Sequence, residues 1–153
     1  MQTIIHTFYE AFKNSDPVAM NACYHDDIEF CDPAFGVLKG DDAKAMWTML
    51  CQNGKDVKVE YSNIKADENK GTAHWEAWYT FSQTGRKVHN IVDAEFELKD
   101  GKIIKHTDRF NLRNWAKQAL GFKGFLLGGT SFFEKKLHEQ TNKTLSKFRK
   151  NQA

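Results

Sequence analysis

The fold of this chain is decided by the segment GKIIKHTDRF, which runs from Gly101 to Phe110. The Asp100-Gly101 pair at its start is typical of a tight turn, so the segment is predicted to be the last strand of a sheet. Side chains of a strand alternate between its two faces. One face carries Ile104, His106, Asp108, Phe110 and Leu112, and the other carries Ile103, Lys105, Thr107, Arg109 and Asn111. The first face is the more apolar and is expected to point inward. An inward His106 and an inward Asp108 need partners or a function, which makes them the first candidate site residues.

The rest of the chain predicts helices around such a sheet. Ile5, Phe8, Tyr9 and Phe12 follow helical spacing. Further helices are expected from Pro17, over 41–52, over 115–120 and over 131–150, with a loop over 34–40 and a flexible apolar link over 122–129. The second helix is expected to bury Val18 and Ala22, with Cys23 as a further candidate at its end. The third is expected to bury Ala43, Met46, Trp47 and Leu50. Strands are expected over 28–33 and, in meander order, in four segments between 57 and 110. We therefore predict one α+β domain over 1–153, with a core of 1–120 and a C-terminal helical extension of 121–153.

The turn before the last strand determines which faces meet. A two-residue turn and a three-residue turn with a glycine bulge both fit the sequence over 99–102. We prefer the second because it pairs the face of Val92, Ala94 and Phe96 with that of His106 and Asp108, so that two apolar faces meet. This register leaves Asp93 on the outer face.

Composition excludes several classes of partner. The net charge is only +2, so no strong attraction to nucleic acid is expected, although residues 131–153 hold six Lys/Arg against two Glu. No apolar run approaches the roughly 20 residues that span a bilayer, so no membrane association is expected. The N-terminus lacks a basic region followed by a long apolar one. The three cysteines suit a reducing compartment, and a cytoplasmic location is expected.

Neither a metal nor a cofactor is expected. The histidines show no ligand spacing, and His106 with Asp108 could not hold a metal ion alone. The glycines of 121–129 do not follow a strand, as a phosphate-binding loop requires.

Each of the other candidate site residues could also have a purely structural role. Asp32, at the end of an apolar strand face beside Pro33, is either a second carboxylate of the site or the start of an Asx-type turn. Tyr9 is either catalytic or part of the core. Inward aromatic residues either line a pocket for a flat apolar ligand or fill it, and Asn90 on the same face needs a hydrogen-bond partner. The ligand-binding candidates are Trp47, Trp75, Tyr79, Asn90, Phe96 and Phe110.

Several motifs, in this order, resemble the SnoaL-like branch of the nuclear transport factor 2-like superfamily. The resemblance covers residues 4–120 and is carried by 8–12, 24–33 and 40–47. Its most specific part is Asp100-Gly101-Lys102-Ile103 followed by His106-Thr107-Asp108. It implies a cone: a curved antiparallel sheet wrapped around a deep apolar pocket that the N-terminal helices close, here with an extra C-terminal helix. It also implies a homodimer through the outer sheet face.

The resemblance also implies residue roles. Asp108 matches the general acid/base of SnoaL-like polyketide cyclases and one aspartate of the Asp–Arg–Asp set in limonene epoxide hydrolases, but no arginine matches the partner position. Asp32-Pro33 resembles the Asp-Pro base of ketosteroid isomerase, and Tyr9 resembles its oxyanion tyrosine. Asp93 falls near the third isomerase residue but is expected to point outward, so the isomerase set is incomplete.

Two functions stay open on this basis. The first is a cofactor-independent acid/base enzyme of isomerase, cyclase or hydrolase type, acting on a small apolar carbonyl-bearing molecule. In it Asp108 moves the proton, His106 sets the charge of Asp108, and Asp32 and Tyr9 supply a second acid/base or a hydrogen bond to the enolate oxygen. The alternative is a non-catalytic ligand-binding or dimerisation domain, which a filled pocket or fully paired polar groups would favour.

Overall fold

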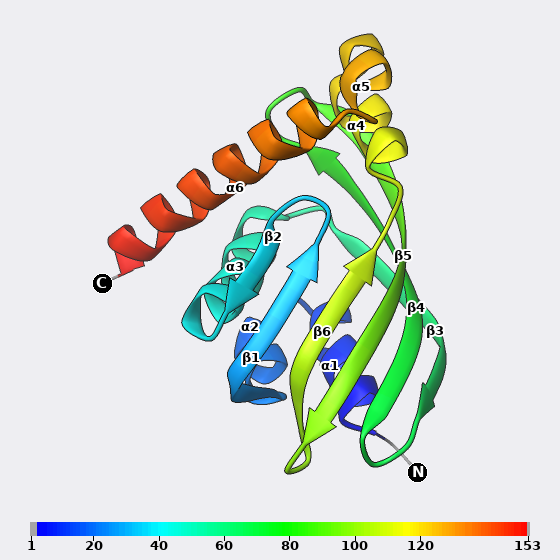
Figure 1. Ribbon diagram of the computed structural model, residues 1–153, viewed down its shortest axis with the longest axis vertical. Coiled ribbons are helices and arrows are strands. Elements are labelled where there is room, and N and C mark those ends of the chain that lie inside the picture. Colours follow the sequence, from blue (N-terminus) through cyan, green and yellow to red (C-terminus); the bar gives the residue numbers. More distant parts are fainter. Residues whose placement is uncertain (1–2, 153) are drawn as a thin grey trace.

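The computed structural model describes residues 3–152, so residues 1, 2 and 153 of the expected domain lie outside the described part. Its helices are α1 (Ile4–Lys13), α2 (Pro17–Ala22), α3 (Asp41–Asn53), α4 (Leu112–Leu120), α5 (Phe122–Leu127) and α6 (Ser131–Gln152). Its strands are β1 (Tyr24–Asp32), β2 (Gly36–Lys39), β3 (Lys58–Ala66), β4 (Lys70–Phe81), β5 (Arg86–Lys99) and β6 (Lys102–Arg109). The architecture is mixed α+β, as predicted (Figure 1).

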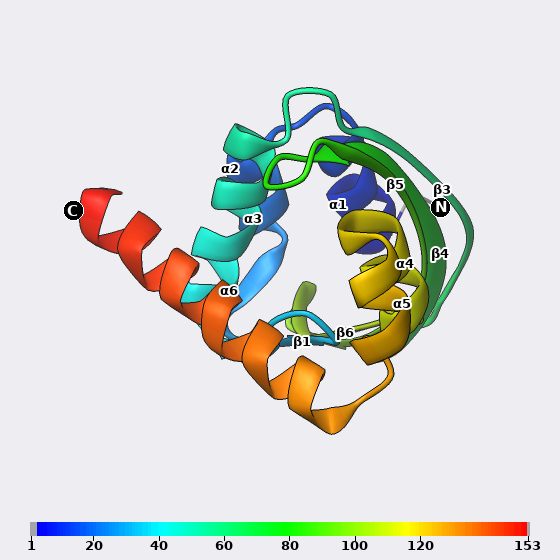
Figure 2. The ribbon, with the colours of Figure 1, turned by 90° about the horizontal axis from the view of Figure 1, so that it is seen from above.

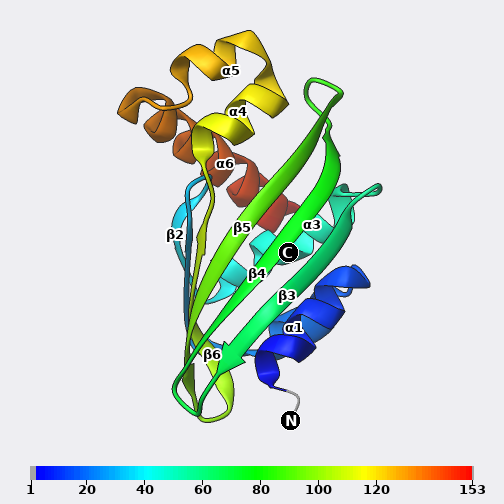
Figure 3. The same cartoon turned by 90° about the vertical axis from the view of Figure 1, so that its right-hand side faces the viewer.

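Six strands form one sheet within residues 3–152, in the order β2-β1-β6-β5-β4-β3. The sheet is curved and unclosed, with α1 on its concave side and α3 facing it across the interior (Figure 2). The expectation of an antiparallel sheet is wrong for one pair, because β1 and β6 run parallel. The long strands β3, β4 and β5 form the wall that Figure 3 shows side by side.

The N-terminal helices begin where their caps indicate. The Thr3 hydroxyl accepts a hydrogen bond from the backbone N–H of His6, and the Asp16 carboxylate accepts one from that of Ala19. The predicted stripe of α1 is buried: Ile5, Phe8, Tyr9 and Phe12. The predicted inner residues are wrong in part for the next two helices. In α2, Val18 and Ala22 are exposed, whereas Met20 and the C-capping residue Cys23 are buried. In α3, Met49 is buried instead of Leu50.

Two segments predicted to be irregular are regular. Within the expected loop over 34–40, β2 pairs with β1, from Asp32 opposite Gly36 to Glu29 opposite Lys39. Within the expected link over 122–129 lies α5. Gly124 is its buried residue, and a Cβ there would lie 1.9 Å from the carbonyl oxygen of Ala116 in α4. Each segment packs on the element that precedes it in the chain, β2 on β1 and α5 on α4, and this packing is not visible in the local hydrophobic pattern of 34–40 or of 122–129.

The preferred three-residue turn before β6 is wrong, because Lys99 pairs with Lys102 and the turn consists of two residues, Asp100 and Gly101, both with positive φ. The register that the preferred turn implied is nevertheless present, because a bulge lies further along β6. Ala94 lies opposite Asp108 and Phe96 opposite His106, so the predicted faces meet. The pairing then shifts, with Glu97 opposite Lys105 and Leu98 opposite Ile103, which leaves Ile104 as the extra residue. Ile103 is consequently fully buried. Its expected place on the outer face is wrong, because simple alternation does not extend across a bulge.

The last helix, α6, packs across β2 and α3. Its predicted inner stripe is its least exposed side, with Leu145 buried and Phe133, Leu137, Thr141 and Phe148 half-buried. The Thr130 hydroxyl caps the helix by accepting a hydrogen bond from the backbone N–H of Phe133. No helix of the described residues is long and apolar enough to cross a membrane.

Candidate functional site

Asp108 and His106 lie inside the cone, on the inner face of β6. His106 is 0% exposed and Asp108 is 3% exposed. His106 Nε2 lies 2.8 Å from Asp108 Oδ1. The two form a buried pair because strand alternation turns both side chains inward and the β5 face that covers them is apolar.

A chain of hydrogen bonds continues from His106 to two residues of other elements. Trp47 Nε1 of α3 donates to the Tyr24 hydroxyl at 2.7 Å, and that hydroxyl lies 2.8 Å from His106 Nδ1. A tryptophan N–H can only donate and a carboxylate can only accept. We therefore assign one direction to the chain: Trp47 donates to Tyr24, Tyr24 to His106, and His106, with its proton on Nε2, to Asp108.

The imidazole of His106 is enclosed by aromatic rings. The Phe96 ring lies 4.4 Å from it between centroids, and the Trp47 ring stacks at 6.1 Å with an interplanar angle of 13°. Phe30 and Phe8 present their rings at 83° and 87° to it. A histidine held in this way contacts no ligand directly. Its chemical effect is to fix the orientation of Asp108 through Nε2–H.

Asp108 keeps one oxygen free. Trp75 Nε1 donates to Asp108 Oδ1 at 3.2 Å, so this oxygen accepts from both Trp75 and His106. The other oxygen, Oδ2, takes part in none of the hydrogen bonds found within residues 3–152. It is therefore the part of Asp108 that a ligand or a water molecule can use.

The Tyr9 hydroxyl is also without a partner. It is buried, and no hydrogen-bonding group of the described residues reaches it. Burial raises the pKa of Tyr9 well above its usual value, and the charge of Asp108 raises it further. Tyr9 thus keeps its proton at every physiological pH. A buried hydroxyl of this kind is a donor that still needs an acceptor.

Asp32 forms the expected Asx-type turn, and its role as a second carboxylate of the site stays a prediction. Its Oδ1 accepts from the backbone N–H of Ala34 at 2.9 Å and of Phe35 at 2.7 Å, which is the Asx-type turn. Burial nevertheless raises its pKa from 3.8 to about 7, opposed by the hydrogen bond from Phe35, and the charge of Asp108 adds to the rise. Asp32 and Asp108 therefore lie close enough to influence each other's charge.

The turn after Asp32 is fastened by α6. His138 Nε2 donates to the carbonyl oxygen of Pro33, Thr141 to that of Ala34, and Asn142 to that of Phe35. These bonds join segments more than one hundred residues apart. The C-terminal extension thus holds the loop whose N–H groups bind the Asp32 carboxylate.

The other expected ligand-binding residues divide into two groups. Trp47, Trp75 and Phe96 are buried and pack against other rings of the core. Tyr79, Asn90 and Phe110 are half-buried. The Tyr79 hydroxyl accepts from Trp115 Nε1 at 2.8 Å, and burial raises the pKa of Tyr79. The deep apolar pocket stays a prediction. A hollow of about 720 Å³ lies on the outer face of the sheet. Residues of β3, β4, β5 and β6 line it, among them Glu95, Lys105 and Arg109.

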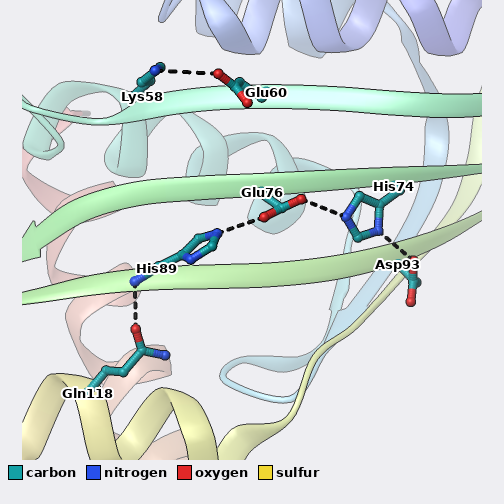
Figure 4. A network of polar contacts seen from close by, with 7 residues as sticks. All are labelled: Lys58, Glu60, His74, Glu76, His89, Asp93 and Gln118. Carbon is teal, nitrogen blue, oxygen red and sulfur yellow. Dashed lines mark hydrogen bonds and ion pairs between the residues drawn. The ribbon is translucent and has the colours of Figure 1, made fainter.

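Asp93 lies on the outer face, as predicted. Its Oδ1 is 2.9 Å from His74 Nδ1, and Glu76 links His74 to His89 (Figure 4). The Asp93 and Glu76 carboxylates, which accept hydrogen bonds from His74, raise the pKa of His74. Asp93 is separated from Asp108 by the sheet, so it cannot complete an isomerase set with Asp32 and Tyr9.

Sequence reasoning missed Tyr24. It shares the even numbering of Ile28, Phe30 and Asp32, which was the available signal, but the strand was expected to begin only at Ile28.

Within the described residues, no three His, Cys, Asp or Glu side chains lie together as a metal site would require.

Comparison with known proteins identifies the family and the fold. A family model described as the SnoaL-like domain matches residues 5–106, and the match ends two residues before Asp108. Among curated proteins, none matches the sequence.

Solved structures share the fold. An epoxide hydrolase of M. tuberculosis described as LEH-like is 22% identical, with a TM-score of 0.61 over 82% of this chain and 88% of that one. A putative polyketide cyclase from Xanthomonas campestris is 21% identical, with a TM-score of 0.63 over 75% and 93%. A Catenulispora acidiphila protein with a ketosteroid isomerase-like fold, in complex with trimethylamine, is 14% identical, with a TM-score of 0.66 over 77% and 94%. At these identities the likeness shows the fold alone.

Proposed function

This chain belongs to the SnoaL-like domain family, and we propose that it is a cofactor-independent acid/base enzyme for a small, apolar, carbonyl-bearing molecule. Structures of this fold include an epoxide hydrolase, putative polyketide cyclases and an isomerase-like protein. The fold hosts several chemistries, so the proposal must rest on the site itself.

The observation that carries the proposal is geometric: Asp108 Oδ2 and the buried Tyr9 hydroxyl have no hydrogen-bond partner among residues 3–152. A second carboxyl, Asp32, supports it through its raised pKa. At about 7, it makes Asp32 able both to take and to give a proton near neutral pH. Asp108, by contrast, holds two donors on one oxygen. Two neighbouring carboxyls in different surroundings are the usual basis of acid/base catalysis by such pairs.

We assign the roles from these contacts. Asp32 takes the proton from the carbon next to the carbonyl group and, once protonated, returns a proton to a carbon of the enolate, so that Asp32 is regenerated. Asp108 offers Oδ2 as the second proton acceptor and is oriented by His106. The Tyr9 hydroxyl donates to the enolate oxygen, which gives its unpaired proton an acceptor. This differs from the sequence-based assignment in making Asp32, rather than Asp108, the leading base.

One observation favours the non-catalytic alternative. Trp47, Tyr24, His106 and Asp108 pair with one another, and the rings around His106 are closely packed. In a ligand-binding or dimerisation domain, this hydrogen-bonded network would serve only to stabilise the fold.

Deuterium exchange separates the two functions without knowledge of the natural substrate. We would measure, by NMR in D₂O, the exchange of the acidic CH₂ protons of 2-tetralone and cyclohexanone, and in parallel the hydrolysis of styrene oxide. The enzyme is expected to accelerate one of these reactions, with a rate that rises with pH through about 7 as Asp32 ionises. Asp32→Asn and Asp108→Asn should each slow it by roughly 10²- to 10⁴-fold.

Asp93→Asn is the matched control, because Asp93 is an exposed carboxylate of the outer sheet face. Its rate should equal that of the wild type. No acceleration of any probe, or full activity of Asp32→Asn, would contradict the proposal and leave the binding domain as the better description.

A further inference from the structure

The apolar surface of this protein is concentrated at one end. Among the large hydrophobic residues that the structure exposes, five of nine fall within residues 122–132: Phe122, Phe125, Leu126, Leu127 and Phe132. We call these five the apolar tip. Phe122 is 73% exposed and Phe132 66% exposed. A group of this kind on one short segment marks an interaction site.

The apolar tip is displayed by a fixed helix. Gly124 and Gly128 face α4, and a Cβ at Gly124 would meet the carbonyl group of Ala116. Their small size brings α5 against α4 and turns Phe122, Phe125 and Leu126 away from the core. In Figure 1, α5 lies at the end of the molecule opposite the N-terminus and the β5–β6 turn.

Cations surround the apolar tip. Between residues 112 and 137 the chain carries Arg113, Lys117, Lys123, Lys135 and Lys136 against the single acid Glu134. Arg113 and Lys117 lie 5.3 and 5.4 Å from the centre of the Phe125 ring, and Lys136 lies 5.7 Å from that of Phe132. These three positive charges therefore lie directly beside the exposed Phe125 and Phe132 rings.

A cationic hollow adjoins the apolar tip. It has a volume of about 530 Å³ and is lined by Arg86, Lys87, Asn114, Lys117 and Gln118, without an acidic residue. Lys117 is shared between the hollow and the Phe125 ring, and the Arg86 guanidinium abuts Gly121, next to Phe122. Apolar side chains, cations and a space for an anion are therefore contiguous.

From these observations we infer that the α5 end of the molecule docks on an anionic lipid membrane. The apolar tip enters the boundary between headgroups and acyl chains, the cations meet the lipid phosphates, and one phosphate occupies the hollow. A membrane fits better than a protein groove, because the apolar side chains project from the end of the molecule. Peripheral binding of this kind needs no membrane-spanning helix. It differs from the expectation, drawn from composition, that the protein does not associate with membranes.

The position of this surface relates it to the cone. Trp115 of α4, on which α5 packs, donates to the hydroxyl of Tyr79 in the inner wall. An apolar molecule dissolved in the membrane would then meet the protein at the α4 end of the cone. The docking inference itself does not depend on catalysis.

Cosedimentation with vesicles tests the inference. The full chain should bind vesicles of phosphatidylcholine with about 30% phosphatidylglycerol, and should bind phosphatidylcholine alone at least about tenfold more weakly. Raising the salt from about 0.05 to about 0.5 M should weaken the first interaction. Phe122→Ser combined with Leu126→Ser, and separately Lys117→Glu combined with Lys123→Glu, should each reduce binding about tenfold or more.

Val18→Ser is the matched control, since Val18 is an 80% exposed apolar residue on α2. It should bind like the wild type, and all variants should keep the wild-type melting temperature. Failure of the wild type to bind anionic vesicles, or equal binding by the tip variants, would overturn the inference. A change of oligomeric state in the Phe122/Leu126 variant without a change in vesicle binding would assign the tip to a second copy of the chain instead.

Discussion

Asp32 is subject to opposing effects on its ionisation. Burial disfavours its charged form, whereas the N–H groups of Phe35 and Ala34 favour it, and the result is a pKa of about 7. Because α6 fastens the carbonyl groups of the same turn, the C-terminal helix contributes to this balance. Asp32 therefore both forms the turn and has a pKa suited to proton transfer near neutral pH.

The pKa of Asp32 has a consequence for stability. Between about pH 4 and about pH 7 the folded chain holds a proton on Asp32 that the unfolded chain has released. The free energy of unfolding that Asp32 contributes therefore falls as the pH rises through this window. The difference in free energy of unfolding between the wild type and Asp32→Asn, measured with urea, should decrease from pH 4 to pH 7 and be constant above about pH 8. Parallel profiles for the two proteins would show that the pKa is not raised.

The Tyr24 hydroxyl links one buried donor, the Trp47 N–H, to one buried acceptor, His106 Nδ1. In Tyr24→Phe, the Trp47 N–H loses its acceptor and His106 Nδ1 loses its donor, in surroundings that admit no water. We expect a loss of about 2 to 4 kcal/mol in the free energy of unfolding, because both groups remain buried without partners. Chemical denaturation measures this.

Tyr61→Phe is the control for Tyr24→Phe. The Tyr61 hydroxyl also bonds to two side chains, Glu10 and His6, but at a half-buried position where water can replace it. Its removal should cost less than about 1 kcal/mol. Equal losses for the two variants would mean that the buried chain adds no stability.

At the scale of the element, the bulge in β6 gives a sharp test of the register. Ile103 is fully buried, whereas Ile104 is the extra residue and is half-buried. Ile103→Ala should therefore lower the free energy of unfolding by about 3 kcal/mol, and Ile104→Ala by about 1 kcal/mol. Urea denaturation of the two variants compares them directly. A larger loss at Ile104 would restore the simple alternation that the sequence suggests.

The elements differ in how far local sequence predicts them. The stripe of α1, the inner side of α6 and the inner face of β5 follow from periodicity alone. The strand β2 and the helix α5 do not, because each is stabilised by packing on the element that precedes it, and neither has a clear hydrophobic period of its own. In the candidate site, His106 and Asp108 follow from alternation, but the role of Tyr24 follows only from the meeting of β1, α3 and β6.

At the scale of the whole molecule, family resemblance implies a homodimer through the outer sheet face. That face carries the polar network of His74, Glu76 and His89, and beside it the exposed Ile91. We expect sedimentation velocity at micromolar concentration to give twice the mass of the chain. Ile91→Arg should shift the protein toward the monomer, because it places a charge in the interface.

Val37→Arg provides the control for the dimer. Val37 and Ile91 are each 53% exposed, but Val37 lies on the edge strand β2, which β1 and β6 separate from β5. This variant should stay dimeric. A wild-type monomer at micromolar concentration would contradict the implied assembly.

The sequence by itself determined what depends on neighbours along the chain. Strand alternation turned Asp108 and His106 inward and Asp93 outward, and helical spacing and capping residues located α1 and the start of α2. Tertiary structure alone decided the properties that depend on which distant segments meet. These are the parallel pairing of β1 with β6, the burial of Ile103, the raised pKa of Asp32 and the outward display of the apolar tip. The physical reason is that periodicity and capping act over a few residues. Burial, charge and close packing are set by groups that the fold brings together from across the whole chain.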